Sequence, residues 1–168
     1  MPADLAENLR RGEIDMAFME HVDVGLRIDF KIKRIEAVPS VILMGVDHPL
    51  AKRKKVSLKQ LDESVWVVWD ERVYPGRRHM LLDAAAEARI LPCIAWDAEN
   101  EEAMYEQVIA CSAIGYAPRV LSEFPEGIAA VNLHPQVLEF PVYLAWRRDS
   151  ENIEQLESFA ECVAGAGS

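Results

Sequence analysis

The residues that could do chemistry in this 168-residue chain form no catalytic or metal-binding pattern. The four histidines have no ligand spacing among themselves, and the three cysteines are far apart and include no CxxC pair. These residues are His21, His48, His79 and His134, with Cys93, Cys111 and Cys162. No nucleophile elbow, phosphate-binding loop or dinucleotide fingerprint occurs. The sequence therefore predicts a protein that is not an enzyme, binds no cofactor or metal ion, and keeps its cysteines as reduced, mostly buried thiols.

One segment combines residue types and a position that suit small-molecule binding. Tyr74-Pro75-Gly76-Arg77 follows the apolar run 65–69, which predicts a buried strand, and precedes a predicted helix over 78–89. The start of a helix presents N–H groups that its own carbonyls leave unpaired, and Arg77 and Arg78 add positive charge. The segment is either a binding site or a plain turn with a solvated arginine pair.

Composition and charge narrow the class of protein. The chain is 51% hydrophobic and 27% charged, which is typical of a globular protein, and its formal net charge is −10. Such an acidic chain is not expected to bind nucleic acid by itself, and the basic run 52–55 is expected on a solvated loop. No apolar run is long enough to span a bilayer and no leader is evident, so we expect no membrane partner and a cytoplasmic location.

Predicted strands and helices alternate along the chain, which indicates an α/β fold. The helices are predicted over 3–11, 78–89, 101–111 and 153–163, with a short helical turn from Ser57, and the strands over 14–18, 41–44, 65–69, 93–96, 128–133 and 141–146. The inner face of the second helix is predicted from its spacing as Leu81, Leu82, Ala85 and Ala88. The stripe of the last helix is predicted as Ile153, Leu156, Phe159, Ala160 and Val163.

Several segments of the sequence resemble segments of the effector-binding domain of LysR-type transcriptional regulators. The first is Leu9-Arg10-Arg11-Gly12-Glu13-Ile14-Asp15-Met16-Ala17-Phe18. The second is His48-Pro49-Leu50-Ala51 followed by Ser57-Leu58-Lys59-Gln60-Leu61. The phrase Ile114-Gly115-Tyr116-Ala117-Pro118 departs from the family, because Ser112 stands where glycine is usual. A left-handed backbone angle at Ser112 would be adopted less easily than by glycine.

The resemblance implies a periplasmic-binding-protein-like (type 2) two-lobed fold. Residues 1–37 would be part of the first lobe, 38–139 the second lobe, and 140–168 the return to the first. The chain resembles an N-terminally truncated member, because the winged helix-turn-helix and the first strand, first helix and second strand of the effector domain are not matched. The first lobe is therefore expected to be incomplete, and strand 14–18 to expose an unpaired edge. Copies are expected to associate through that edge or through helix faces.

The same resemblance implies an effector site in a crevice between the lobes. The residues expected there are Phe18, Glu20, Tyr74, Pro75, Gly76, Arg77, Glu99 and Tyr116. Family members hold the effector, often by its carboxylate, at the segment that begins with Tyr74. Glu20 would repel an acid, so the effector is not acidic on that side, or Glu20 is a surface residue. Glu99 and Asn100 could instead serve as a helix cap, and Tyr116 could belong to the core.

The function implied by the resemblance is effector sensing and oligomerisation in a LysR-type regulator. The expected partners are an unidentified small-molecule effector and further copies of the chain, as a dimer or tetramer. DNA would be bound only through a helix-turn-helix that this chain does not contain. A stand-alone solute-binding protein of the same fold is the alternative, and a dehydratase-like enzyme is a further one.

Overall fold

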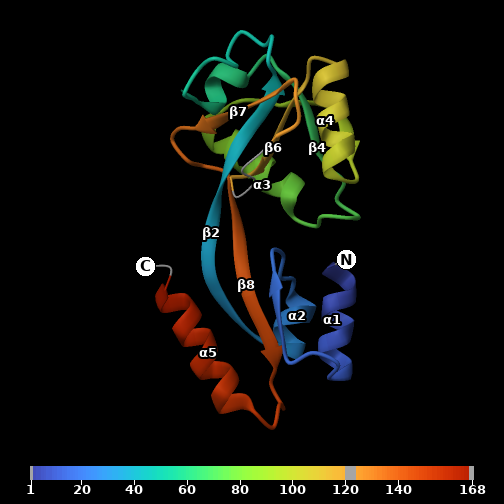
Figure 1. Cartoon of the computed structure of the whole chain (residues 1–168), viewed down its shortest axis with the longest axis vertical. Helices are drawn as coiled ribbons and strands as arrows, with labels where there is room; N and C mark the ends of the chain where they lie inside the picture. The colour runs from blue at the N-terminus through green and yellow to red at the C-terminus, as the bar shows by residue number, and fades with distance from the viewer. Residues whose placement is uncertain (1, 120–123, 167–168) are drawn as a thin grey trace. The chain divides into compact units, whose positions relative to one another are not determined.

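Helices and strands alternate along the part of the chain that the computed structural model describes, residues 2–119 and 124–166. Contacts divide the chain into two units. The terminal unit comprises Met1–Ala37 with Pro141–Ser168, and the central unit comprises Val38–Phe140. Two long strands, β2 (Phe30–Gly45) and β8 (Glu139–Arg147), contribute residues to both units (Figure 1).

In the terminal unit a short antiparallel strand pair lies between helices. Strand β1 (Met16–Met19) pairs with β8, with Ala17 opposite Ala145 and Phe18 opposite Leu144. Helix α1 (Pro2–Arg11) covers one face of the pair and helix α5 (Ile153–Ala166) covers the other (Figure 1). A third helix, α2 (Val24–Asp29), precedes β2 and has no buried residue. Because side chains alternate across a strand, the unit has two small cores, one on each face of β1.

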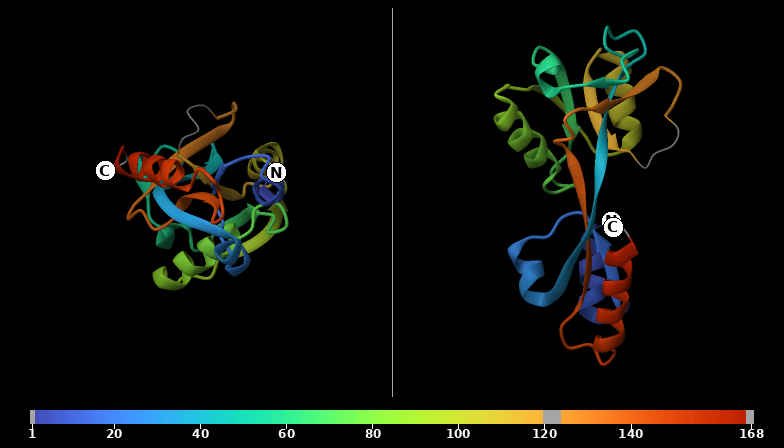
Figure 2. Two further views of the ribbon diagram at one scale, coloured as in Figure 1. Left: turned by 90° about the horizontal axis from the view of Figure 1, so that it is seen from below. Right: turned by 90° about the vertical axis from the view of Figure 1, so that its left-hand side faces the viewer.

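The central unit is built around strand β4 (Val65–Trp69), which lies between β5 (Cys93–Ala98) and β6 (Ile114–Pro118) and is parallel to both. Beyond β6 the sheet continues antiparallel through residues 40–45 of β2 to β7 (Ile128–Leu133). The short strand β3 (Lys55–Val56) adds to β7 in parallel. Helices α3 (Arg77–Ala88) and α4 (Glu101–Ala110) lie on either side of β4 (Figure 2), and the 3-10 turn η1 (Leu58–Leu61) also packs against α3.

Burial explains the composition of β4. Its residues Trp66, Val67, Val68 and Trp69 are almost completely buried, because helices cover both faces of a parallel strand. Helix α4 packs directly on β6, since a Cβ added at Gly115 would lie 2.4 Å from the Met104 Sδ atom. The glycine therefore sets how closely the helix approaches the sheet. The predicted strand over 65–69 and the predicted α/β class are confirmed.

Most predicted elements are present, with some differences. Helix α2 and strands β3 and β6 were not predicted, and β2 extends over sixteen residues where only 41–44 were expected. Pro39 does not interrupt β2, because its carbonyl still accepts a hydrogen bond from the Arg119 N–H at 2.8 Å. The inner face of α3 includes Ala84 and not Leu82, which is 38% exposed.

The surface corrects two further predictions and confirms one. All three cysteines are exposed, so the prediction that they are mostly buried is wrong. Phe159 was expected to pack inward from α5 but is 51% exposed. The basic run 52–55 is exposed, as predicted. Among the described residues, no helix combines the length and apolar character needed to cross a bilayer.

The end of α4 yields a stability prediction. Ser112 has φ of +50°, in the left-handed region that costs a residue with a Cβ roughly 1–2 kcal/mol. Ser112→Gly removes this strain but gives the unfolded chain more freedom, so we expect a net gain of about 0.5–1 kcal/mol in the free energy of unfolding. Urea denaturation measures the gain. Ser112→Ala, which keeps a Cβ, is the control, and an equal gain in that variant would contradict the explanation.

Candidate functional site

The candidate site lies where two neighbouring parallel strands of the central unit end. Trp69 at the end of β4 is opposite Ala98 at the end of β5, so the loops 70–76 and 99–100 leave the sheet side by side. Helices α3 and α4 begin directly after these loops. Ligands of open α/β sheets bind beyond the carboxyl ends of the strands, where such helix starts converge.

Asp70 and Arg72 fix the first half of the loop. Asp70 is buried, and its carboxylate accepts hydrogen bonds from the Arg72 backbone N–H at 2.8 Å and from Arg72 Nε at 3.0 Å. The hydrogen bonds from the Arg72 side chain are the main cause that lowers the pKa of Asp70 to about 2. The Asp70 carbonyl also accepts from the N–H groups of Val73 and Tyr74. The loop therefore has a fixed internal hydrogen-bond network.

Glu71 and Gly76 join the second half of the loop to the start of α3. Gly76 is the N-cap residue and has φ of +84°, a backbone angle that favours glycine. Its N–H donates to Glu71 Oε1 at 2.6 Å, and the same carboxylate oxygen lies 3.5 Å from His79 Nδ1. A carboxylate of the protein thus already sits at this helix start. The positive end of the helix dipole favours a negative charge at this position.

The Arg77 guanidinium is placed by three aromatic rings. It lies 4.2 Å from the ring centroid of Tyr74, 4.5 Å from that of Trp69 and 4.9 Å from that of Phe140. Cation–π attraction favours a guanidinium over a ring face. A planar guanidinium that stacks on rings has its N–H donors in its own plane, which is the geometry in which arginine binds a carboxylate.

Tyr116 supports the site from the core. Its side chain is fully buried, with its ring stacked on Phe140 at 6.0 Å between centroids. Its hydroxyl donates a hydrogen bond to the Arg77 carbonyl at 2.7 Å, and burial raises the pKa of this phenol. Of the two alternatives left open by the sequence, the core position is the one observed. Tyr116 fixes the first residue of α3 from the strand below.

The remaining predicted residues of the central unit lie at the rim. Pro75 is exposed, and Glu99 is exposed and lies 3.4 Å from the Arg72 guanidinium. Asn100 caps α4, because its side chain accepts from the Ala103 N–H at 2.8 Å. The capping role expected for this segment therefore belongs to Asn100. Among the described residues, no group of three His, Cys, Asp or Glu side chains is placed to hold a metal ion.

Phe18 and Glu20 belong to the terminal unit. Phe18 is 53% exposed on β1, where it lines a pocket of that unit, and Glu20 is exposed directly after the strand. The structure brings Tyr74, Gly76, Arg77 and Tyr116 together within the central unit. Their relation to Phe18 and Glu20 stays a prediction.

Sequence reasoning missed four residues that shape the site: Asp70, Glu71, Arg72 and Phe140. An acidic and a basic residue two apart after a strand are a weak signal, because such pairs are common in any charged loop. Phe140 stands 63 residues from Arg77 in the sequence, so only the folded sheet brings its ring to the guanidinium. Trp69 is buried in the core and also contacts the Arg77 guanidinium.

Comparison with known proteins identifies the kind of domain. A family model described as "LysR substrate binding domain" matches residues 1–168. The Hca operon transcriptional activator HcaR of Escherichia coli (strain K12) is 39% identical over 70 residues, which are 42% of this chain and 23% of that protein. The HTH-type transcriptional regulator TtuA of Agrobacterium vitis is 27% identical over 115 residues, 68% of this chain and 38% of that protein. The matches thus span less than two fifths of either relative.

Solved structures agree in fold. CbnR, a LysR family transcriptional regulator, superposes with a TM-score of 0.82 at 16% identity, over 98% of this chain and 57% of that one. The BenM effector-binding domain with its effector benzoate superposes with a TM-score of 0.74 at 17% identity, over 98% and 76% of the two chains. The predicted periplasmic-binding-protein-like (type 2) fold is confirmed.

The low pKa of Asp70 predicts a pH dependence of stability. A carboxyl group whose pKa falls from 3.8 to about 2 on folding stabilises the protein above its unfolded pKa. That contribution disappears as the pH falls through the folded value, because both states are then protonated. We expect Asp70→Asn to lower the urea midpoint at pH 7. The difference in urea midpoint between this variant and the unmodified protein should shrink as the pH falls from about 4 to about 2. Glu99→Gln is the control, and a gap independent of pH for Asp70→Asn would contradict this role.

Proposed function

Because this chain belongs to the LysR substrate-binding domain family, we propose that it is the effector-sensing and oligomerising domain of a LysR-type transcriptional regulator. The observation that carries the proposal is the Arg77 guanidinium, placed on three aromatic rings at the start of α3. The relatives HcaR and TtuA are transcriptional regulators, which supports a sensor over an enzyme or a transport protein.

The proposed effector is a small molecule with a carboxylate. The start of α3 offers backbone N–H groups and the positive end of the helix dipole, to which Arg77 adds a full charge. The contact of Glu71 with the Gly76 N–H supports this choice, since it is the same kind of bond that an acid would make. The BenM domain, which has this fold, is described with benzoate as its effector, and that ligand is also a carboxylate.

The proposed roles differ among the residues of the central unit. Tyr74, Pro75, Gly76 and Arg77 contact the effector, and Tyr116 positions Arg77 from below. Glu99 lies across the loop next to Arg72 and limits how much negative charge a ligand can carry there. Phe18 and Glu20 stay proposed contacts of the terminal unit.

The role of the whole protein is proposed from the family to which this chain belongs. It would act as a homo-oligomer, dimer or tetramer, in the cytoplasm, and bind DNA through a helix-turn-helix outside these residues. An effector can switch such a protein only if it binds one conformation better than another. The chain itself has a net charge of −10, which agrees with a sensing part that leaves DNA contacts to another domain.

Substitution of Arg77 tests the site. A charge-assisted hydrogen bond is worth about 1.5–3 kcal/mol, so Arg77→Gln should weaken binding of a carboxylate by about 10- to 100-fold. Benzoate and a panel of hydroxylated and aromatic carboxylic acids are titrated into the protein by calorimetry. Arg89→Gln, at the other end of the same helix, is the matched control. Absence of binding by any acid, or equal loss in both variants, would count against the proposal.

Substitution of Glu71 tests the site in the opposite direction, because it is expected to strengthen binding of a carboxylate. Its carboxylate occupies the Gly76 N–H and places negative charge where the acid would bind. Glu71→Gln should therefore tighten binding of the best acid of the panel by roughly 3- to 10-fold, with neutral amide analogues unaffected. Glu87→Gln, on an exposed position of α3, is the control. Weaker binding by Glu71→Gln would show that Glu71 assists the ligand.

A further inference from the structure

Carboxylates of the protein hold two arginines next to the start of α3. Arg78 Nη2 lies 3.3 Å from Asp97 Oδ1, near the end of β5. Arg72 donates from Nε to the buried Asp70 at 3.0 Å, and its Nη2 lies 3.4 Å from Glu99 Oε1. An acid group of a ligand could therefore use either arginine only by replacing one of these partners.

These five side chains also act on one another through their charges. Hydrogen bonding to Asp70 raises the pKa of the Arg72 guanidinium, and the charges of Glu99 and Asp97 raise it further. Besides the hydrogen bonds from Arg72, the charge of Arg78 helps to lower the pKa of Asp70. Because such effects require short distances, the five side chains form one charged group, the strand-end cluster.

Acids outnumber bases in the strand-end cluster, which combines the carboxylates of Asp70, Asp97 and Glu99 with two guanidinium groups. At the adjacent start of α3, Glu71 adds one carboxylate and Arg77 adds one guanidinium, so the excess of acid persists. Asp97 and Glu99 are exposed, and their charges therefore face whatever binds beside them. A ligand with a second carboxylate would bring it to a region of excess negative charge.

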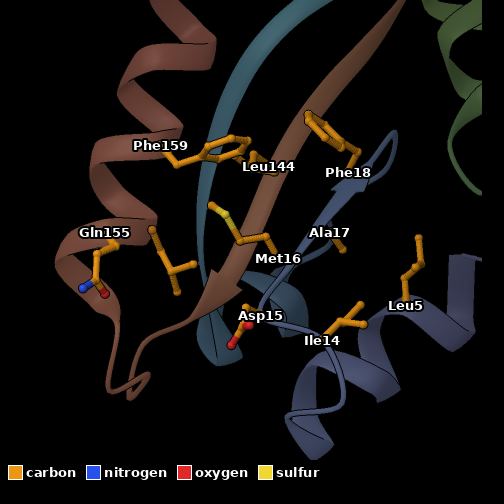
Figure 3. A pocket seen from close by; sticks show the side chains of 10 residues that line it. Leu5, Ile14, Asp15, Met16, Ala17, Phe18, Leu144, Gln155 and Phe159 are labelled. Atoms are coloured by element: carbon orange, nitrogen blue, oxygen red, sulfur yellow. The ribbon is translucent and has the colours of Figure 1, made fainter.

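A pocket of the terminal unit offers no cation that could accept this second carboxylate (Figure 3). Among its described lining residues, Asp15 is the only ionisable one and carries the same sign of charge as the ligand. The rest of the lining is apolar apart from Gln155. The arginines of the central unit are thus the groups that determine the charge of an acceptable acid.

On the basis of the proposed function, we propose that Asp97 and Glu99 are specificity-determining residues that restrict the effector to acids with a single carboxylate. Arg77 and the start of α3 bind that carboxylate, and the remainder of the effector is uncharged beside the strand-end cluster. A second carboxylate is repelled by both acids and must break an ion pair to reach Arg72 or Arg78. A hydroxyl in the same place carries no charge and can donate a hydrogen bond to either acid.

Matched pairs of benzoate derivatives test the proposal by calorimetry, at a pH where every carboxyl group is ionised. Phthalate, isophthalate and terephthalate are each compared with the hydroxybenzoate that is substituted at the same ring position. In each pair the dicarboxylate should have a dissociation constant at least about 5-fold higher than the hydroxybenzoate. A dicarboxylate that binds as tightly as its hydroxylated counterpart would overturn the proposal.

Variants of the strand-end cluster separate local charge from the net charge of the chain. Glu99→Gln and Asp97→Asn each remove one exposed carboxylate, and each should lower the ratio of the two dissociation constants about 2- to 3-fold. Glu87→Gln and Asp83→Asn, at exposed positions of α3, are the charge-matched controls and should leave the ratio unchanged. An equal fall in the controls would assign the discrimination to the net charge of −10 and contradict the role of the two acids.

Failure of the acid site itself gives a different result. If neither benzoate nor any of its derivatives binds, the proposed function and the specificity assignment are both overturned. If the hydroxybenzoates bind and Arg77→Gln weakens them, but the dicarboxylates bind equally well, the acid site stands and the assignment of Asp97 and Glu99 is wrong.

Discussion

The hydrogen bond from the Tyr116 hydroxyl to the Arg77 carbonyl is the interaction on which the candidate site depends. It connects a strand in the middle of the central sheet to the first residue of α3. The ring is fully buried and also contacts Trp66 and Phe140, so the hydroxyl has a fixed position. A buried phenol without a partner would be costly, so the fold itself requires that carbonyl to be where it is. The position of the Arg77 side chain follows from this constraint and from the rings around it.

Much of the central sheet could be predicted because its signals are local. Strand β4 reads as an uninterrupted apolar run, and a strand covered by helices on both faces needs such a run. The segment Tyr74 to Arg77 could be located because it lies between that strand and a helix, which is a relation visible in the sequence. The left-handed angle at Ser112 could also be anticipated, since a helix must end there without a glycine.

Other features could not be predicted because they depend on partners distant in the sequence. Phe140 reaches Arg77 only through the pairing of strands, and the two roles of Trp69 cannot be separated by periodicity. The spacing of Phe159 places it on the apolar stripe of α5, yet a stripe is buried only where something covers it. Burial of the cysteines was predicted from the average behaviour of the residue type, and that average does not determine any one position.

The exposed cysteines have a practical consequence. Cys93 and Cys111 belong to the central unit and Cys162 to the terminal unit, and all three thiols are accessible. Replacement of either Cys93 or Cys111 by serine leaves one native thiol on each unit. A pair of maleimide dyes on such a chain would report the separation of the two units by energy transfer, with no engineered cysteine. The native cysteines thus provide attachment points for measuring the distance between the terminal unit and the central unit.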